Sequence, residues 1–325
     1  MTSFASSQIC PTCWARLNTS PPRSANQFQS VSKKTHSTMV VITHIVGGLG
    51  NQMFQYAVGR SLSVSTGQTL KLDLASMKKY TRREFSLQQF NIHAELARPH
   101  ETPVTRSRGF LRRAFQLIQR QSPCQHITEK AHTFDPTVMS LGGSLYFDGY
   151  WQSEKYFASI ANTIRSDFSL AAPLSSGREA ILSHIRTTNA VSVHVRRGDY
   201  VTNPSANATH GTIEPGWYEA AMQRMAERTD DPSFFVFSDD PAWAQQNLKS
   251  SWKMTFVEPQ QDGRDGEDMH LMAACRNHIT ANSTFSWWGA WLNANPAKHV
   301  IAPLHWFRSP LHDDKDLIPA TWERV

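Results

Sequence analysis

The chain has 325 residues, of which 40% are hydrophobic and ten are tryptophan, and its formal net charge is +6. This length and composition predict one large globular domain or two of ordinary size with substantial cores. Residues 1–38 contain four basic residues and no acidic one, so the rest of the chain is nearly neutral at +2. Because a nucleic-acid-binding domain usually carries a basic surface on its folded body, nucleic acid is not expected as a partner.

Residues 1–38 are predicted to be a disordered basic tail, because they are rich in polar residues and proline and show no apolar period. They lack the apolar segment of a signal peptide. No run in the chain approaches the ~18 apolar residues of a transmembrane helix. Cys10 and Cys13 form a CxxC pair, but no second pair completes a zinc site. We therefore expect a cytoplasmic protein with no resident metal or other cofactor.

The segment after the tail alternates short apolar runs with longer amphipathic ones. Its predicted strands are 39–46, 69–74 and 144–151, and its predicted helices are 51–65 and 153–168, the second with Ser153 as its cap. Residues 95–133 are basic and irregular and are expected to be a surface excursion. The stretch AAPLSSG, at 171–177, has the composition of a connector.

After this connector the alternation restarts. The sequence predicts a helix up to about residue 185, then strands at 190–195, 234–238, 254–257, 277–280 and 299–302 that alternate with helices at 215–228, 241–249, 266–275 and 284–293. Short connections between alternating strands and helices are typical of a parallel sheet with helices on both faces. The fold class is therefore α/β, with two facing Rossmann-like domains at 39–170 and 178–308 and a C-terminal segment at 309–325.

Ligands of open parallel sheets bind beyond the carboxyl ends of the strands, so the clusters that follow each strand matter most. The first is GGLGNQ, at 47–52. It resembles a dinucleotide-binding fingerprint, but Met53 occupies the place of the third glycine. Asn51 and Gln52 stand at the start of a helix, where an anion or a sugar can dock. A simple tight turn is the alternative interpretation.

The second cluster is HVRRGDY, at 194–200, where two arginines leave a buried strand. An unpaired buried guanidinium is strongly unfavourable, and the planar fork of Arg196 suits phosphate oxygens. Arg197 points to the other side of the strand and is open to pairing with Asp199 or another carboxylate. His194 is either a core histidine or a ligand contact.

A third cluster, FSDDP, follows the next strand. One of its two aspartates, Asp239 or Asp240, is expected to cap the helix that Pro241 begins, and the other is available to a ribose or a guanine edge.

The fourth cluster is TANSTFSWWGAWL, at 280–292. Residues 282–284 open a helix directly after a strand and offer backbone N–H groups and hydroxyls to an anion. Its tryptophans at 287, 288 and 291 have helical spacing and are expected to lie in the core. A diphosphate therefore fits between Arg196 and this helix start.

Taken together, these segments resemble the bacterial and animal α-1,2-fucosyltransferases of glycosyltransferase family 11. The resemblance covers residues 39 to about 308 and rests on five motifs in the same order, namely GGLGNQMFQYAVGRSLS, DGYWQSEKYF, HVRRGDYV, FSDD and DMHLMAACRNHITANSTFSWWGAWLN. It implies a two-domain GT-B fold, GDP-β-L-fucose as donor, and transfer with inversion to a sugar hydroxyl, usually the 2-hydroxyl of galactose.

The resemblance also implies roles for particular residues. Arg196 would hold the β-phosphate, and Asn51 would lie near the donor phosphates and the acceptor. The donor-binding set is completed by His194, Arg197, Ser238, Asp239, Asp240, Asn282, Ser283, Thr284, Phe285 and Ser286. On the acceptor side we expect Gln52, Tyr150 and Trp151. Phe147, Tyr150 and Trp151 could pack on a sugar face, although core packing is the default interpretation for all three. Asp199 is the nearest motif carboxylate and is a candidate general base; a structural ion pair is its alternative role.

Many transferases neutralise the leaving diphosphate with a metal bound by a D-x-D motif. The one such triplet, Asp314-Lys315-Asp316, follows the last predicted strand and is interpreted as solvated surface. Arg196 and backbone donors are therefore expected to replace the metal. The expected partners are GDP-fucose and a galactose-terminated oligosaccharide, and a lipid-linked acceptor would bring the protein to the inner membrane surface. A fucosyltransferase of another linkage, such as α-1,3, and a non-catalytic nucleotide-sugar-binding protein are the alternatives.

Overall fold

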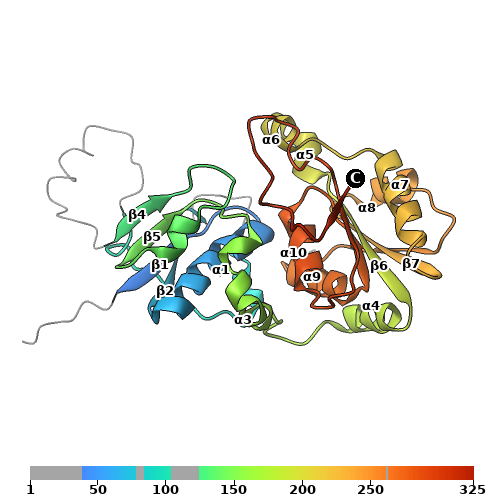
Figure 1. Cartoon of the computed structure of the whole chain (residues 1–325). Coiled ribbons are helices and arrows are strands. Elements are labelled where there is room, and N and C mark those ends of the chain that lie inside the picture. Colours follow the sequence, from blue (N-terminus) through green and yellow to red (C-terminus); the bar gives the residue numbers. More distant parts are fainter. Residues whose placement is uncertain (1–38, 78–83, 104–123, 261–262) are drawn as a thin grey trace, which may run out of the picture. The chain divides into compact units, whose positions relative to one another are not determined.

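The computed structural model describes residues 39–77, 84–103, 124–260 and 263–325. The tail predicted to be disordered lies outside these residues. The described chain forms two parallel β-sheets with helices packed on them (Figure 1). The prediction of an α/β protein built from two Rossmann-like units is therefore confirmed.

The first sheet has the strand order β3-β2-β1-β5-β4, and every pairing in it is parallel. Its strands are β1 (Val40–His44), β2 (Thr69–Asp73), β3 (Glu95–Leu96), β4 (Gln125–Thr128) and β5 (Leu145–Asp148). Helix α1 (Leu49–Thr66) packs on it so closely that a Cβ on Gly59 would lie 2.5 Å from the Thr43 side chain. Strands β3 and β4 fall inside the stretch predicted to be irregular. Both are short, and their side chains are largely exposed, so they carry little apolar signal.

The segment predicted as one helix over 153–168 is broken. It contains two 3₁₀ helices, η4 (Glu154–Tyr156) and η5 (Ala158–Ile160), before helix α3 (Ala161–Asp167). Phe157, at the break, is fully buried and stacks on Trp288 with ring centroids 5.3 Å apart. Tertiary packing of this ring therefore prevails over the local helical pattern. The prediction that Ser153 is the cap is confirmed, because its Oγ accepts the Lys155 N–H.

The second sheet has the strand order β11-β10-β9-β6-β7-β8, again parallel throughout. Its strands are β6 (Asn189–Val195), β7 (Pro232–Ser238), β8 (Met254–Val257), β9 (Asn277–Ile279), β10 (Val300–Ala302) and β11 (Glu323–Arg324). In chain order this is the 3-2-1-4-5-6 arrangement, whose strand order reverses between β6 and β9, and ligands bind at that reversal. Strand β11 shows that the C-terminal segment contributes a strand to this sheet.

The predicted helices of the second half are all present. They are α4 (Ser176–Arg186), α7 (Pro215–Ala226), α8 (Pro241–Asn247), α9 (Asp265–Ala274) and α10 (Thr284–Leu292) (Figure 1). Two short helices that the sequence analysis did not predict, α5 (Gly198–Thr202) and α6 (Pro204–His210), follow the arginine motif. They are five and seven residues long, which is too short for an apolar period to be recognised.

The tryptophans of α10 lie in the core, as predicted. Trp287 and Trp288 are fully buried, and both rings contact Phe54 of α1 at centroid distances of 4.5 and 4.9 Å. These aromatic contacts join the helix that follows β1 to the helix that follows β9. Two motifs more than 200 residues apart in the sequence are thereby fixed against each other.

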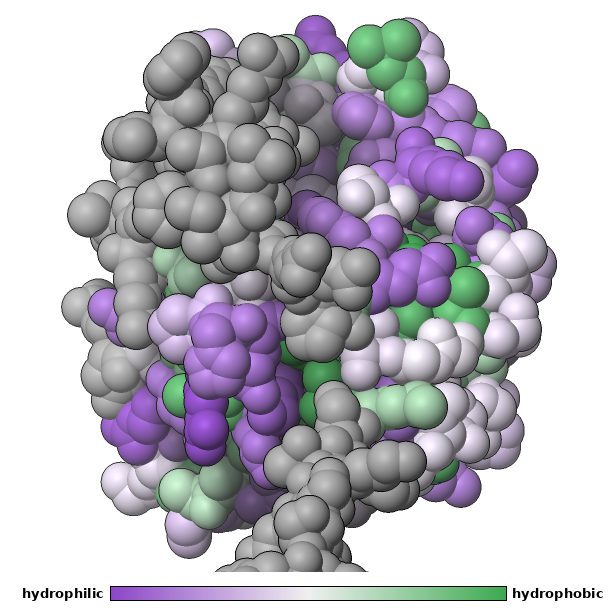
Figure 2. Space-filling model, turned by 90° about the vertical axis from the view of Figure 1, so that its left-hand side faces the viewer, coloured by the Kyte–Doolittle hydropathy of each residue, from purple (hydrophilic) through white to green (hydrophobic). Residues whose placement is uncertain are grey.

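Exposed large hydrophobic side chains are few and scattered in the described chain, and they include Met39, Leu96, Tyr150 and Leu311. On the face seen in Figure 2, the coloured residues are mainly hydrophilic, and the hydrophobic ones form small separate areas. Within the described residues, every helix is too short or too polar to cross a membrane.

Candidate functional site

A cavity of about 520 Å³ lies where the strands β6, β7 and β9 end, and the loops that follow β1 and β5 also line it. This volume is typical of ligand pockets. The cavity brings together most of the residues that the sequence analysis selected, namely Asn51, Tyr150, His194, Arg196, Asp199, Ser238, Asp239, Asn282, Ser283, Thr284 and Phe285.

Two helix N-termini meet at this cavity. A Cβ added to Gly50, near the start of α1, would lie 2.5 Å from the carbonyl carbon of Thr284, the first residue of α10. Asn51 Oδ1 accepts hydrogen bonds from Thr284 Oγ1 at 2.9 Å and from Gln152 Nε2 at 3.0 Å. Both helices therefore direct the positive ends of their dipoles to one place, which favours a bound anion.

Arg196 lines the cavity and is held by two carboxylates. Its guanidinium lies 2.5 Å from Asp199 Oδ1 and 2.8 Å from Asp239 Oδ2, and it stands over the Tyr200 ring at 5.3 Å. Burial by itself would lower the pKa of Arg196, but the charges of Asp239 and Asp199 raise that pKa above its usual value. The guanidinium is therefore charged and fixed in orientation before any ligand arrives.

Arg197 is not among the residues that line the cavity. Its Nε lies 3.3 Å from Asp240 Oδ2, and its guanidinium stacks over Trp243 at 3.9 Å. Of the two partners considered for Arg197, the pairing with Asp199 is wrong, because Asp199 pairs with Arg196. Another carboxylate, that of Asp240, takes its place.

The prediction that one aspartate of FSDDP caps a helix is confirmed. Asp240 accepts the Trp243 N–H at 3.2 Å at the start of α8. Asp239 is the aspartate that lines the cavity, and it also accepts the Arg197 N–H at 2.8 Å. The two neighbouring aspartates thus have different roles, one in the local fold and one in the site.

His194 is buried beside Arg196, and its ring lies 5.6 Å from that of Phe285. Burial lowers the pKa of His194 to about 3, and the charge of Arg196 acts in the same direction. The imidazole is therefore neutral at pH 7. Its Nδ1 has no hydrogen-bond partner among the described residues, so a ligand donor or acceptor would satisfy it.

Besides Arg197 and Asp240, three predicted site residues do not line the cavity. Gln52 is fully buried and bonds to the backbone of Gly47, Glu84 and Ser86, which fixes the turn before α1. Trp151 is a core residue with 2% exposure. Ser286 is fully buried, and its Oγ donates to the carbonyl oxygens of Ala281 and Ser283. These three side chains therefore belong to the buried structure around the cavity and not to its lining.

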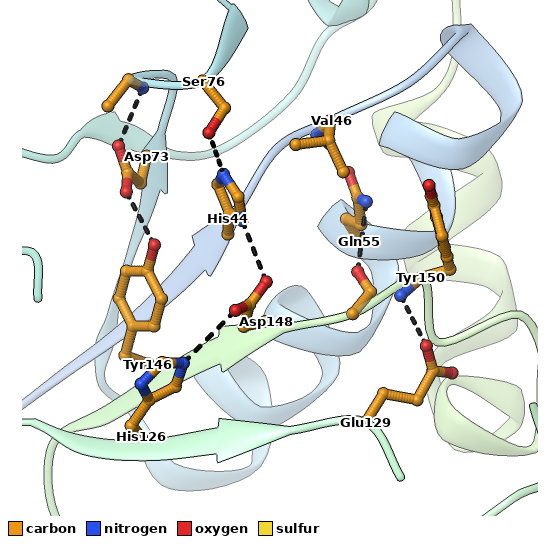
Figure 3. A network of polar contacts seen from close by, with 12 residues as sticks. His44, Val46, Gln55, Asp73, Ser76, His126, Glu129, Tyr146, Asp148 and Tyr150 are labelled. Carbon is orange, nitrogen blue, oxygen red and sulfur yellow. Dashed lines mark hydrogen bonds and ion pairs between the residues drawn. The ribbon is translucent and has the colours of Figure 1, made fainter. Parts of the chain in front are cut away.

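A polar network fixes the loops that follow the first sheet (Figure 3). His44 bonds through Nδ1 to Asp148 Oδ1 at 3.0 Å and through Nε2 to Ser76 Oγ at 2.7 Å. Glu129, which directly follows β4, accepts the N–H groups of Tyr150 and Trp151 in the loop after β5, at 2.7 and 2.9 Å. The hydrogen bond to Glu129 therefore fixes the backbone of Tyr150, which lines the cavity.

Several lining residues were missed by sequence reasoning, namely His132, Tyr200, Thr209, His210, Pro259, Gln260, Asp265, Asp268, Trp306, Phe307 and His312. Most lie in loops or in short helices with no motif of their own. Asp268 begins the last quoted motif and could have been noticed. It pairs with Arg178 at 2.8 Å, and burial raises its pKa to about 6.

The D-x-D triplet is not the solvated surface that the sequence suggested. Asp314 accepts the Trp306 N–H at 2.7 Å and pairs with Arg324, and Asp316 accepts the Phe134 N–H at 2.9 Å. These carboxylates fasten the C-terminal segment to the rest of the chain. The surface interpretation failed because tertiary contacts of distant segments cover them. In the part of the chain that the structure describes, no group of three or more His, Cys, Asp or Glu side chains is arranged to hold a metal ion.

The sequence profile of glycosyl transferase family 11 matches residues 8–324. The α-1,2-colitosyltransferase of Escherichia coli is 36% identical over 294 residues, which cover 88% of this chain and 99% of that protein. The O-antigen biosynthesis glycosyltransferase WbnK of Escherichia coli is 34% identical, and the match covers 80% of this chain and 93% of that protein. The galactoside α-(1,2)-fucosyltransferase 1 of Mus musculus is 29% identical, and the match covers 84% of this chain and 68% of that protein.

Proposed function

Because the chain belongs to glycosyl transferase family 11 and is a glycosyltransferase, we propose that it transfers L-fucose from GDP-β-L-fucose to the 2-hydroxyl of a galactoside. Transfer proceeds with inversion and without a divalent metal. The acceptor is an oligosaccharide of a glycan or surface polysaccharide under construction. A lipid-linked acceptor would bring the enzyme to a membrane surface, and that association stays a prediction, as does a cytoplasmic location.

The observation that carries this proposal is the convergence of Arg196 with the N-termini of α1 and α10 at one cavity. A diphosphate carries the charge that these three groups complement. The carboxylate Asp239 and the neutral His194 line the same cavity beside Arg196. They suit the hydroxyls of a ribose or the edge of a base, which both donate and accept hydrogen bonds.

Glycosyl transfer separates the sugar, with growing positive charge, from a diphosphate with growing negative charge. Arg196 is already oriented by its two carboxylates, so little reorganisation is needed when the charge develops on the diphosphate. Asp199 was a candidate general base, but it is engaged with Arg196 at 2.5 Å. We therefore give Asp199 a positioning role, and the acceptor proton leaves late, to the departing diphosphate or to water.

The test of the proposed function replaces Arg196 and its neighbour. Arg196→Ala should lower kcat with GDP-fucose and a galactoside by about 10²–10³, the usual cost of one transition-state donor, while its circular dichroism spectrum stays native. Arg197→Ala should keep most of the activity, because Arg197 packs on Trp243 outside the cavity lining. Near-normal turnover by Arg196→Ala would remove the proposal's central residue.

Similarity to a colitosyltransferase favours a second candidate, in which colitose replaces fucose in the donor. Colitose differs from fucose by the absence of one hydroxyl, so the same diphosphate site would serve both. Parallel assays with GDP-fucose and GDP-colitose decide between them, and NMR of the product distinguishes an α-1,2 linkage from another linkage such as α-1,3. Binding of GDP without turnover of either donor would instead support a non-catalytic binding protein.

A further inference from the structure

Phe307 stands at the centre of a group of three histidines on one wall of the cavity. The ring centroids of His132, His210 and His312 lie 5.4, 5.5 and 5.0 Å from that of Phe307. His132 and His312 also contact each other at 4.9 Å. The four side chains come from three separate parts of the sequence, and all four line the cavity. We call them the histidine wall.

The histidine wall differs in chemistry from the part of the cavity assigned to the diphosphate. Tyr200 lies between the two parts, because its ring stacks on His210 at 4.7 Å and lies under the Arg196 guanidinium at 5.3 Å. On one side of Tyr200 are the cation Arg196 and its carboxylates. On the other side are imidazoles and an apolar ring.

Polar atoms of the histidine wall lack partners. The Nδ1 atoms of His132 and His210 are buried and accept or donate no hydrogen bond to any described residue. Buried polar atoms are normally paired, so such orphans at a cavity indicate a ligand that supplies the missing partners. His194 and Asn282, which line the same cavity, carry unpartnered buried atoms as well.

Two imidazoles of this wall, those of His132 and His210, have lowered pKa values and are uncharged at neutral pH. Burial lowers the pKa of His210 to about 4, although the nearby Asp199 acts in the opposite direction. Burial also lowers the pKa of His132, and His312 adds to this effect. A neutral imidazole has one donor and one acceptor, which matches sugar hydroxyls, and an aromatic ring suits the apolar face of a sugar. A carboxylated sugar would gain no cation from His132 or His210.

We propose that Phe307, His132, His210 and His312 form the subsite of the acceptor sugar, and that this subsite selects a neutral, hydroxyl-bearing ring. This inference rests on the proposed function, because it places the acceptor beside the diphosphate of the donor. Phe307 packs against the ring of the sugar, and the histidines bond to its hydroxyls. Tyr200 separates the acceptor from Arg196.

The test uses the full chain and variants that keep an aromatic ring while removing hydrogen bonds. In His132→Phe and His312→Phe, the KM for methyl β-galactoside should rise about 3- to 10-fold each, the equivalent of one lost hydrogen bond. The affinity for GDP, measured by titration calorimetry, should change less than twofold. His132→Gln should recover part of the loss because it restores a donor and an acceptor.

His184→Phe is the matched control. The His184 ring also packs on a phenylalanine, Phe235, at 5.0 Å, but it does not line this cavity. The His184→Phe variant should change neither the KM for methyl β-galactoside nor the affinity for GDP. Methyl β-galacturonide, which differs from the galactoside by one carboxylate, should bind the native protein at least tenfold more weakly in saturation-transfer NMR with GDP present.

The possible results separate the subsite from the proposed function. If the native enzyme transfers fucose but both phenylalanine variants keep their acceptor KM, the subsite is wrong and the function stands. Loss of GDP affinity in those variants would also overturn the subsite, because the wall would then belong to the donor. If the native protein transfers nothing, yet binds the galactoside in NMR through these histidines, the function is wrong and the subsite stands. Absence of galactoside binding in that case rejects both.

Discussion

Gly50 of α1 lies directly against the first residues of α10 at the cavity, and this close approach predicts the effect of a single methyl group. In Gly50→Ala the new Cβ would lie 2.5 Å from the Thr284 carbonyl carbon and 2.7 Å from the Phe285 nitrogen. Ordinary contacts between carbon atoms are about 3.5–4.0 Å, so the two backbones must separate by about 1 Å. Backbone atoms on both sides leave no flexible side chain to absorb this shift.

The expected cost has a stability part and a catalytic part. Overpacking of this kind costs about 1–3 kcal/mol, and the shift also strains the hydrogen bond from Trp288 Nε1 to the Gly50 carbonyl, which is 2.9 Å long. A displacement of about 1 Å between groups that hold one substrate can lower the rate by about 10²-fold. We therefore expect a lower Tm and a much lower kcat/KM with GDP-fucose.

Two glycines provide matched controls because each is also the second residue of its helix. A Cβ on Gly177 of α4 or Gly216 of α7 would meet no described atom within 4 Å. Alanine at these positions should be neutral or stabilise the protein by up to about 1 kcal/mol. The measurements are thermal unfolding by circular dichroism and steady-state kinetics of all three variants. If Gly50→Ala behaves like the two controls, the close approach of α1 and α10 is not a requirement of the site.

Three further predictions concern the scaffold and the metal-free mechanism. Trp288→Phe removes the hydrogen bond to Gly50 and part of a buried ring, so it should lower the unfolding free energy by about 1–3 kcal/mol in urea titrations; an unchanged midpoint would contradict this. The hydrogen bond from His44 holds the pKa of Asp148 below its usual value, so this contribution is complete above about pH 4 and is lost as the pH falls through the lower folded value. The gap in Tm between the native protein and Asp148→Asn should therefore narrow as the pH falls below about 4, and a constant gap would reject the explanation by this hydrogen bond. Transferase activity should persist in EDTA, because Arg196 and two helix termini supply the positive charge; abolition by EDTA and recovery with Mn²⁺ would show that they do not suffice.

The motifs that follow strands were visible in the sequence because they depend on local chemistry. A glycine-rich turn, an arginine pair after an apolar run and a polar helix start are each encoded within a few residues. Alternation of apolar runs predicted the parallel sheets, and the carboxyl-end rule then selected the edge of the second sheet at which the cavity lies. Eleven of the predicted residues line the cavity for this reason.

The partners of these residues were not visible, because they come from distant parts of the chain. Spacing alone left Asp199 open to pairing with Arg197, whereas the fold gives Asp199 to Arg196. The histidine wall depends on residues 132, 210, 307 and 312, whose segments carry no periodic pattern and meet only after folding. The sequence by itself determined which strand ends carry reactive groups, since hydrophobic burial sets the strands. Only the tertiary structure decided which charged groups pair and which rings line the same side of the cavity. The energies of ion pairs and ring contacts depend on distances between segments that the sequence leaves unspecified.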